Sequence, residues 1–251
     1  MEFNESDIIL KRSYKTVYHV GDEIIKVFEP NHPKVGIFNE ALITSYVESY
    51  GVSAPPVRYV RCFDGKWAIA IEYVEGITME EKLKSEPDKL EENLERFVDI
   101  QIEVNSFRAP GLRNTVDKRL EEIRNLEGLD ASTRYELEQR LHGMQRHTKL
   151  CHGDFDPSNV ILIPDGGYKV IDWSHATQGN AGADAAMTYL RFMLQDKKVA
   201  DLYLRIYCKK SDTAIQYVQR WMPIVAAGQL TKKRPEEKAM LESWVSVAEY
   251  Q

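Results

Sequence analysis

Short apolar runs alternate with turn residues over the first seventy positions of the chain. The runs are rich in β-branched residues, as expected of strands, and glycines at 21 and 65 lie in turns between them. The expected strands are residues 7–10, 16–20, 23–28, 57–60 and 67–71. Between the third and fourth runs, helical spacing extends from Pro33, suited to a helix start, to Gly51, suited to a helix end. The pattern predicts a five-stranded antiparallel sheet with one helix.

Helical periodicity dominates from residue 78 onward. Thr78 and Glu81 fit a capping box, and a helix containing Leu90 and Phe97 is expected to end at Pro110-Gly111. Further helices are expected at residues 116–126, 131–147 and 182–192, and in a last stretch around Tyr203, Tyr217, Trp221 and Trp244. Core packing of these aromatic residues is favoured over the lining of a ligand pocket. The fold class predicted is α+β, with a mainly helical second part.

A hairpin interrupts the helical part. Two β-branched runs, residues 159–163 and 168–172, flank the turn sequence Pro-Asp-Gly-Gly, and Asp-Gly between apolar runs is a strong hairpin signal. A turn centred on Asp165-Gly166 places Asn159 directly opposite Asp172. Opposed Cβ atoms lie about 4.5–5.5 Å apart, so a carboxylate and an amide oxygen there can share one hard cation. Mg²⁺ with phosphate oxygens is the usual occupant of such a site.

Asp154 lies five residues before Asn159, on the segment that leads into this hairpin. Phosphoryl transfer needs positioned phosphates, Mg²⁺ and a carboxylate that orients the attacking hydroxyl. An aspartate is ionised at neutral pH and accepts the proton, and the spacing Asp-x-x-x-x-Asn also matches the kinase catalytic loop. The alternative is a surface hairpin whose polar residues only decorate turns. The agreement of three polar residue types at one constrained spacing favours the catalytic interpretation.

The segment His-Gly-Asp-Phe-Asp-Pro-Ser-Asn at 152–159, followed by Val-Ile-Asp-Trp at 170–173, resembles the aminoglycoside phosphotransferase and choline kinase-like superfamily. These proteins are small-molecule kinases that share the protein-kinase fold. The resemblance implies two lobes: an N-lobe at 1–71, a hinge at 72–78, and a C-lobe at 79–251 that carries the catalytic loop, the metal hairpin and the acceptor-binding helices.

The resemblance also implies a phosphate-binding lysine on the third strand, which is Lys26. On position alone, a lysine in a strand is more often a solvated residue. Its expected partner is Glu40, because this glutamate shares a helix face with Ile43 and Val47 and needs a counter-charge there. Glu48 is the competing candidate, on another face near the helix end.

Other contacts with the nucleotide are expected from the backbone. The resemblance places the Glu72 carbonyl and the Val74 amide at the adenine edge. The loop at residues 11–16 contains no glycine, so it is not a Gly-rich phosphate-covering loop. The hydroxyl of Ser13 or Thr16, together with backbone amides, is expected to contact phosphate instead.

Three residues are expected to support the site. The resemblance implies that His152 braces the catalytic loop and that Asp184 holds it, although Asp184 also fits a simple helix N-cap. Asp156 stands where protein kinases have a lysine, and we hypothesise that it contacts Mg²⁺ or a cationic acceptor. Gly153 replaces the arginine of protein kinases, and Trp173-Ser174 replaces their Phe-Gly. These differences place the chain in the small-molecule branch.

Composition limits the possible partners and location. The net charge of -6 argues against a nucleic-acid partner, and no apolar run is long enough to span a bilayer, so no membrane partner is expected. Three cysteines without CxxC or metal spacing indicate reduced thiols and a cytoplasmic protein.

The sequence therefore predicts a Mg²⁺-dependent phosphotransferase. It moves the γ-phosphate of ATP or GTP to a hydroxyl of an aminoglycoside, choline, a sugar or a related metabolite. The alternative is a catalytically weak or inactive nucleotide-binding pseudokinase that acts as an interaction module. The glycine-free first loop is its only support, since all five of the required polar residues are present. A metal-dependent hydrolase is a third possibility, but the sequence lacks a histidine-rich ligand set.

Overall fold

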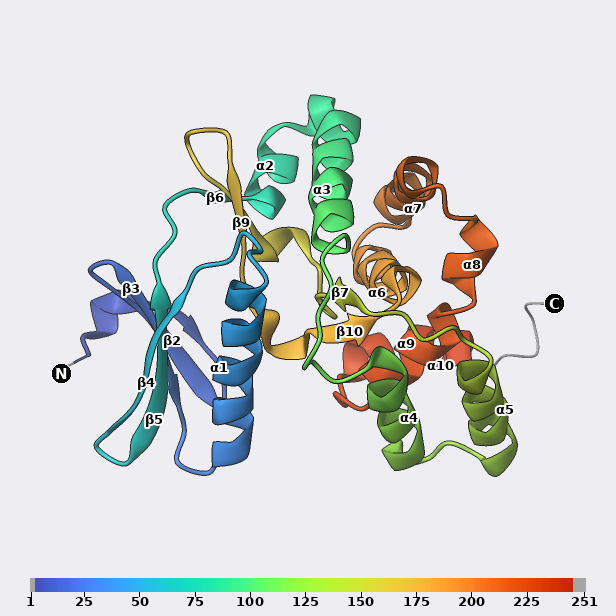
Figure 1. The fold of residues 1–251 in the computed structure, drawn as a ribbon, viewed down its shortest axis with the longest axis horizontal. Helices are drawn as coiled ribbons and strands as arrows, with labels where there is room; N and C mark the ends of the chain where they lie inside the picture. Colours follow the sequence, from blue (N-terminus) through green and yellow to red (C-terminus); the bar gives the residue numbers. More distant parts are fainter. Residues whose placement is uncertain (1–2, 246–251) are drawn as a thin grey trace. The chain divides into compact units, whose positions relative to one another are not determined.

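The computed structural model describes residues 3–245, which form two compact units (Figure 1). Among the described residues, one unit comprises 3–85 and Pro157–His175, and the other comprises Glu86–Asp156 and 176–245. We call them the sheet unit and the helical unit. The chain thus leaves the sheet unit after α2 and returns to it for the hairpin. The lobe boundaries expected at 71 and 79 stay a prediction.

The sheet unit contains the five-stranded antiparallel sheet that the sequence predicted. Its strands are β1 (Ile8–Lys11), β2 (Lys15–Val20), β3 (Glu23–Phe28), β4 (Val57–Phe63) and β5 (Lys66–Glu72). Their order is β1-β2-β3-β5-β4, so β3 lies in the centre. Asp64 and Gly65 both have positive φ in the two-residue turn between β4 and β5, which is the geometry that an Asp-Gly hairpin favours.

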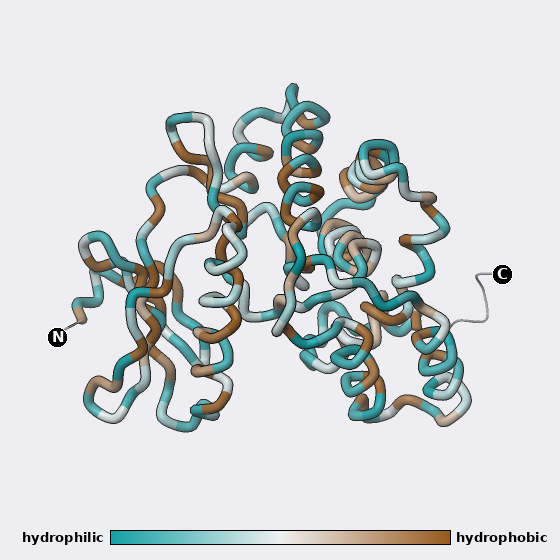
Figure 2. Tube along the Cα trace, viewed as in Figure 1, coloured by the Kyte–Doolittle hydropathy of each residue, from teal (hydrophilic) through white to brown (hydrophobic). Residues whose placement is uncertain are grey.

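Helix α1 (Lys34–Ser49) packs against β4 and β5 (Figure 1). Its apolar residues Ile37 and Ala41 join Phe28 and two sheet residues in a buried cluster, and the hydrophobic colouring of the strands in Figure 2 follows this core. The helix ends as predicted, because Gly51 takes the left-handed conformation at φ +78° just beyond it.

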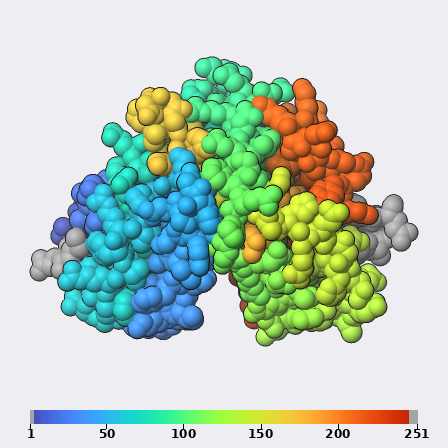
Figure 3. Space-filling model, viewed as in Figure 1, coloured from blue at the N-terminus to red at the C-terminus, as the bar shows by residue number. Residues whose placement is uncertain are grey.

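The hairpin forms, but its predicted register is wrong by one residue. Strands β8 (Val160–Leu162) and β9 (Tyr168–Val170) pair with Val160 opposite Val170, so Asn159 lies opposite Ile171 rather than Asp172. The cause is the loop: Ile163 and Gly167 bond to each other, which leaves three residues in the turn instead of two or four. A three-residue loop needs one left-handed residue, and Gly166 supplies it at φ +92°. The exposed loop tip projects from the surface in Figure 3.

The remaining elements of the sheet unit are β6 (Ile77–Thr78), which pairs with β8, and α2 (Met79–Ser85). The capping box predicted for this helix is present. The Glu81 amide donates to Thr78 Oγ1 at 3.1 Å, and the Thr78 amide donates to Glu81 Oε2 at 2.7 Å.

The helical unit is mainly helical, as predicted. Its elements are α3 (Leu90–Val104), α4 (Thr115–Asn125), α5 (Ala131–His142), α6 (Ala181–Met193), α7 (Lys197–Ser211), α8 (Ile215–Gln219), α9 (Met222–Leu230) and α10 (Pro235–Val245), with a two-stranded ladder of β7 (Lys149–Cys151) and β10 (Thr177–Gly179). Tyr203, Trp221 and Trp244 are buried, so these aromatic residues belong to the core. Within residues 3–245, no helix combines the length and apolarity needed to cross a membrane.

Two helices end earlier than the sequence suggested. Helix α3 stops at Val104, six residues before Pro110, because the segment that follows turns to pair with the strand region near β7: the Leu150 amide donates to the Phe107 carbonyl at 2.8 Å. Helix α5 stops at His142 with Gly143 as its C-cap, instead of continuing to residue 147.

Candidate active site

Lys26 links two acidic side chains in the sheet unit. Its ammonium donates to Glu40 Oε1 at 2.7 Å and to Asp172 Oδ1 at 3.0 Å. Burial opposes the charge on Lys26, but the two carboxylates outweigh this effect, so its pKa lies above its ordinary value. The lysine therefore stays cationic, as a phosphate-binding group must.

Helix periodicity positions Glu40 for this contact. Glu40 follows the buried residue Ile37 by three positions and precedes the buried residue Thr44 by four, so its side chain leaves α1 on the face that covers the sheet. Glu48, the competing candidate, is exposed. The pairing expected between Lys26 and Glu40 is thus present in the structure, whereas the binding of phosphate by Lys26 stays a prediction.

Asp172 and Asn159 come from adjoining segments of the hairpin base. Asn159 ends a 3-10 turn (Pro157–Asn159), and its carbonyl accepts from the Ile171 amide at 2.9 Å. Asp172 follows at once and has φ +62°, a left-handed conformation that aspartate tolerates better than most residues. This conformation replaces the predicted cross-strand pair: Asp172 leaves the ladder, and its carboxylate reaches Lys26.

The donor chemistry here fits a magnesium ion. Mg²⁺ is usually held by one or two carboxylates together with waters and phosphates, and the Asp172 side chain keeps 38% of its surface exposed. Among the described residues, no group of three or more His, Cys, Asp or Glu side chains could hold a metal ion. A site built from one carboxylate, one amide and phosphate oxygens does not need such a group.

The expected adenine-binding segment leaves the sheet where the sequence suggested. Glu72 is the last residue of β5, and the Tyr73 amide donates to the Asp22 carbonyl at 2.9 Å. Val74 lies in the irregular segment between β5 and β6. The use of the Glu72 carbonyl and the Val74 amide for nucleotide binding stays a prediction.

The glycine-free loop closes tightly and contains a lysine that the sequence reasoning missed. The Arg12 amide donates to the Lys15 carbonyl at 2.9 Å, which leaves Ser13 exposed at the tip. Lys15 is buried, and its pKa is lowered first by desolvation and then by Lys26. Thr16 is buried in β2 and Ser13 is not. Only the absence of glycine in this loop marked it as unusual in the sequence.

In the helical unit, Asp184 holds the segment that carries Asp154. Its carboxylate accepts from the His152 amide at 3.1 Å, the Gly153 amide at 2.7 Å and the Asn105 side chain at 3.1 Å. The cap of α6 is Asn180, whose side chain accepts from the Gly182 amide. The N-cap alternative for Asp184 is therefore wrong. Asn105 was missed because nothing in the sequence marks its position at the end of α3.

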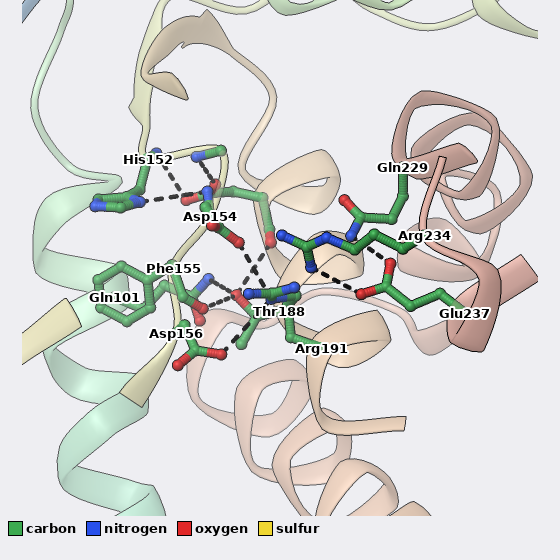
Figure 4. A network of polar contacts seen from close by, with 12 residues as sticks. Gln101, His152, Asp154, Phe155, Asp156, Thr188, Arg191, Gln229, Arg234 and Glu237 are labelled. Atoms are coloured by element: carbon green, nitrogen blue, oxygen red, sulfur yellow. Dashed lines mark hydrogen bonds and ion pairs between the residues drawn. The ribbon is translucent and has the colours of Figure 1, made fainter. Parts of the chain in front are cut away.

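His152 is fully buried and turns back on its own loop. Its Nδ1 accepts from the Asp154 amide at 3.3 Å, and its ring meets Phe155 edge-on. The Phe155 carbonyl accepts from Thr188 Oγ1 at 2.8 Å, and Gln101 donates to the same hydroxyl at 3.0 Å (Figure 4). These buried contacts hold the backbone of residues 152–155, and a role for His152 in bracing the loop stays a prediction.

Arg191 of α6 lies beside the two loop aspartates, as Figure 4 shows. Its Nε is 3.2 Å from Asp154 Oδ1 and 3.7 Å from Asp156 Oδ2. Asp156 is buried against Arg191. Its suggested contact with Mg²⁺ or a cationic acceptor remains untested. Arg191 was missed because an arginine near the end of a helix looks like an ordinary surface residue in the sequence.

A buried aspartate that accepts three bonds is expected to matter for stability. Asp184→Ala should lower the free energy of unfolding by about 3 kcal/mol or more, because it leaves two backbone amides and the Asn105 amide without their charged acceptor. Asp196→Ala, which removes the exposed N-cap of α7, should cost only about 1 kcal/mol. Urea denaturation measures both variants, and equal losses would contradict the role of Asp184.

Helix α4 carries a lysine with a perturbed pKa. Lys118 is partly exposed as a residue, yet desolvation of its ammonium and the neighbouring Arg119 lower its pKa to about 8. The unfolded chain then binds more protons than the folded chain between pH 8 and about 10.5, so stability rises with pH across this window.

Lys118→Met should remove this rise, which is at most about 3 kcal/mol. Thermal melts of both proteins at pH 7, 8.5 and 10 measure it. A rise that persists in the variant would contradict the assignment to Lys118.

The fold of this chain is similar to that of solved phosphotransferases and kinases. A thermostable mutant of aminoglycoside phosphotransferase APH(4)-Ia in apo form is similar at a TM-score of 0.71 and 14% identity, over 95% of this chain and 91% of that chain. An aminoglycoside-3'-phosphotransferase of type VIII is similar at 0.61 and 17%, over 89% and 93%. A choline/ethanolamine kinase family protein from Mesorhizobium loti is similar at 0.59 and 15%, over 96% and 88%.

A family model described as the phosphotransferase enzyme family matches residues 7–224, and the chain belongs to this family. The predicted superfamily and the kinase-like fold are thus confirmed. The comparison with curated proteins returns no match.

Proposed function

We propose that this protein transfers the γ-phosphate of ATP or GTP to a hydroxyl group of a small molecule with the help of Mg²⁺. The observation that carries the proposal is the position of Lys26, which bonds Glu40 and Asp172 at 2.7 and 3.0 Å. A structural ion pair needs one partner, whereas kinases need a strand lysine paired with a helix glutamate together with a metal-binding aspartate, and Lys26 bonds the residues expected in both positions.

In this proposal each side chain has one task. Lys26 binds the α- and β-phosphates and Glu40 fixes its direction, while Asp172 and Asn159 hold Mg²⁺, which neutralises developing charge on the phosphate oxygens. Asp154 accepts the proton of the acceptor hydroxyl as the O–P bond forms. The Glu72 carbonyl and the Val74 amide contact the base.

Lys15 extends the proposal. A kinase without a Gly-rich loop needs another source of positive charge or amide donors over the phosphates, and Lys15 is buried within electrostatic reach of Lys26, Asp172 and Glu40. The Ser13 hydroxyl and loop amides add hydrogen bonds, whereas the buried position of Thr16 makes its hydroxyl the weaker candidate. In this proposal, Lys15 and the loop donors take over the role of the missing Gly-rich loop. The absence of glycine was the support for an inactive pseudokinase, and it then no longer favours that alternative.

A cytoplasmic location completes the proposal, because Cys62, Cys151 and Cys208 are all free thiols. Similar structures were solved with ADP and hygromycin B, or with AMP-PNP and hygromycin B, which supports a nucleotide and a small-molecule acceptor here.

The test is release of nucleoside diphosphate by the full chain, with ATP or GTP and a panel of hydroxyl compounds, with Mg²⁺ and with excess chelator. The proposal expects acceptor-stimulated release that requires Mg²⁺. Nucleotide binding without any release under these conditions would instead support the pseudokinase.

A further inference from the structure

Cationic side chains gather around Asp154 in the helical unit. Arg191 reaches it from α6 at 3.2 Å, and Lys232 and Arg234, in the segment between α9 and α10, lie within electrostatic reach of it. Figure 4 shows Arg191 and Arg234 on the same side of Asp154. The pKa of Arg234 is raised, first by its hydrogen bond to Glu237 and also by Asp154, so its charge lies within electrostatic reach of that carboxylate.

Acidic side chains balance these cations. The three that pair with the basic side chains, Asp154, Asp156 and Glu237, are less accessible than the arginines, whereas Glu236, which also lies within electrostatic reach of Arg234, is exposed. Arg234 keeps 33% of its side chain exposed and Arg191 keeps 21%. The values are 17% for Asp154 and 9% for both Asp156 and Glu237. A ligand that approaches Asp154 in the helical unit therefore meets guanidinium groups more than carboxylates.

The Glu237 carboxylate accepts hydrogen bonds from two neighbouring side chains. It accepts from Gln229 Nε2 at 2.7 Å and from Arg234 Nη1 at 2.8 Å. Burial opposes its ionisation, but these two hydrogen bonds and the nearby Arg191 outweigh burial and lower its pKa. Glu237 thus fixes the direction of Arg234 without offering a free negative charge to a ligand.

Arg191 retains donors beyond its contact with Asp154. A guanidinium has five N–H groups in a planar fork, and Nε is the atom nearest to Asp154. Within the described part of the chain, this Nε makes an ion pair but no aligned hydrogen bond. The carboxylate contact therefore uses little of the hydrogen-bonding capacity of Arg191.

Neighbouring lysines show the effect of crowded positive charge. Lys232 has an exposed surface, yet enough of the chain surrounds its ammonium that desolvation lowers its pKa. Asp154 opposes this shift, and Arg191 and Arg234 increase it. The pKa of Lys118 on α4 is likewise lowered by desolvation and by neighbouring cations, which include Lys232. The basic group thus extends from α6 across the α9–α10 connection to α4.

We propose that the acceptor is an anionic hydroxyl compound, whose carboxylate or phosphate is bound by Arg191, Lys232 and Arg234 while its hydroxyl lies at Asp154. This inference rests on the proposed phosphotransferase function and deepens it. Arginine matches both anions through paired N–H···O bonds, whereas choline or an aminoglycoside would bring positive charge toward three cations. The acceptor class thus differs from the aminoglycosides of the similar structures.

The test compares small hydroxyl compounds that differ mainly in charge. Full-length protein loaded with Mg²⁺ and AMP-PNP is titrated by calorimetry with glycerate, glycerol 3-phosphate, glycerol and choline. We expect at least one of the two anions to bind about tenfold more tightly, or better, than glycerol and choline. Glycerate reports a carboxylate preference and glycerol 3-phosphate reports a phosphate preference.

Variants then locate the anion. Arg234→Gln and the more exposed Lys232→Gln should each weaken binding of that anion about tenfold, with unchanged affinity for AMP-PNP. The matched control is Lys233→Gln, which removes the same charge from the same segment, where the exposed Lys233 pairs with Glu127 at 2.8 Å. The control should leave anion binding unchanged.

Three results would overturn the inference: anions that bind no better than glycerol or choline, no measurable binding of either anion, or a loss in Lys233→Gln as large as in Arg234→Gln. The proposed function is tested separately by AMP-PNP binding and Mg²⁺-dependent diphosphate release. If the nucleotide binds and is turned over with neutral or cationic acceptors, only the anionic acceptor is wrong. If the nucleotide does not bind, both proposals fail.

Discussion

Asp154→Asn is expected to lower kcat for phosphate transfer by about 10²–10⁴-fold, the usual contribution of a positioned general base. An asparagine amide is nearly isosteric with the carboxylate but cannot accept the hydroxyl proton. Lys26 and Glu40, the proposed phosphate grip, are untouched by this change, so the KM for nucleotide should stay within about threefold of its original value. Steady-state release of nucleoside diphosphate, with the acceptor and the nucleotide varied separately, measures both constants.

The control for this prediction is Asp99→Asn on α3, since Asp99 is an exposed aspartate of the helical unit that pairs with Lys210. It should retain full kcat. The loss in Asp154→Asn must also occur without a large change in melting temperature, because Asp184 and its bonds to the His152 and Gly153 amides remain. A variant that keeps more than a third of the original kcat would show that Asp154 is not the base.

Asp172→Asn is expected to lower kcat at least about 100-fold, because the charge stabilisation that a metal ion supplies is worth several kcal/mol. The same change should raise the Mg²⁺ concentration needed for half-maximal rate. It also removes a carboxylate bonded to Lys26, so the pKa of that lysine should fall, although Glu40 remains at 2.7 Å. Turnover measured across a Mg²⁺ titration separates the metal effect from the lysine effect.

Asp165→Asn, at the exposed tip of the same hairpin, is the matched control and should leave the Mg²⁺ dependence unchanged. Glu40→Gln provides a contrast. It should weaken nucleotide binding, because Lys26 loses its helix partner, while half-maximal Mg²⁺ stays the same. If Asp172→Asn and Glu40→Gln gave the same Mg²⁺ dependence, Asp172 would not be a metal ligand.

The hairpin shows how far local sequence rules reach. The β-branched runs and the glycine-containing turn correctly predicted two paired strands, because both signals depend on residues close in sequence. The register depended on whether the loop holds two, three or four residues. The hydrogen bond between Ile163 and Gly167 closes a three-residue loop. The register therefore shifts by one residue, and Asn159 lies opposite Ile171 instead of Asp172.

The pairing of Lys26 with Glu40 was predictable for a different reason. The family resemblance singled out the lysine on the third strand, and helical periodicity turned one glutamate toward the core, where it needed a counter-charge. The third member, Asp172, was not predictable as a partner of Lys26, since its reach depends on a left-handed backbone at φ +62° and on the return of the chain to the sheet unit.

The sequence by itself determined the family, the five strands, the principal helices and the identity of the motif residues, because these depend on local periodicity and on an ordered run of polar types. Only the tertiary structure showed which unmarked residues lie beside the predicted ones: Asn105 beside Asp184, Lys15 near Lys26, and Arg191 at Asp154. Contacts between residues far apart in the chain depend on helix packing and burial, which no local pattern encodes.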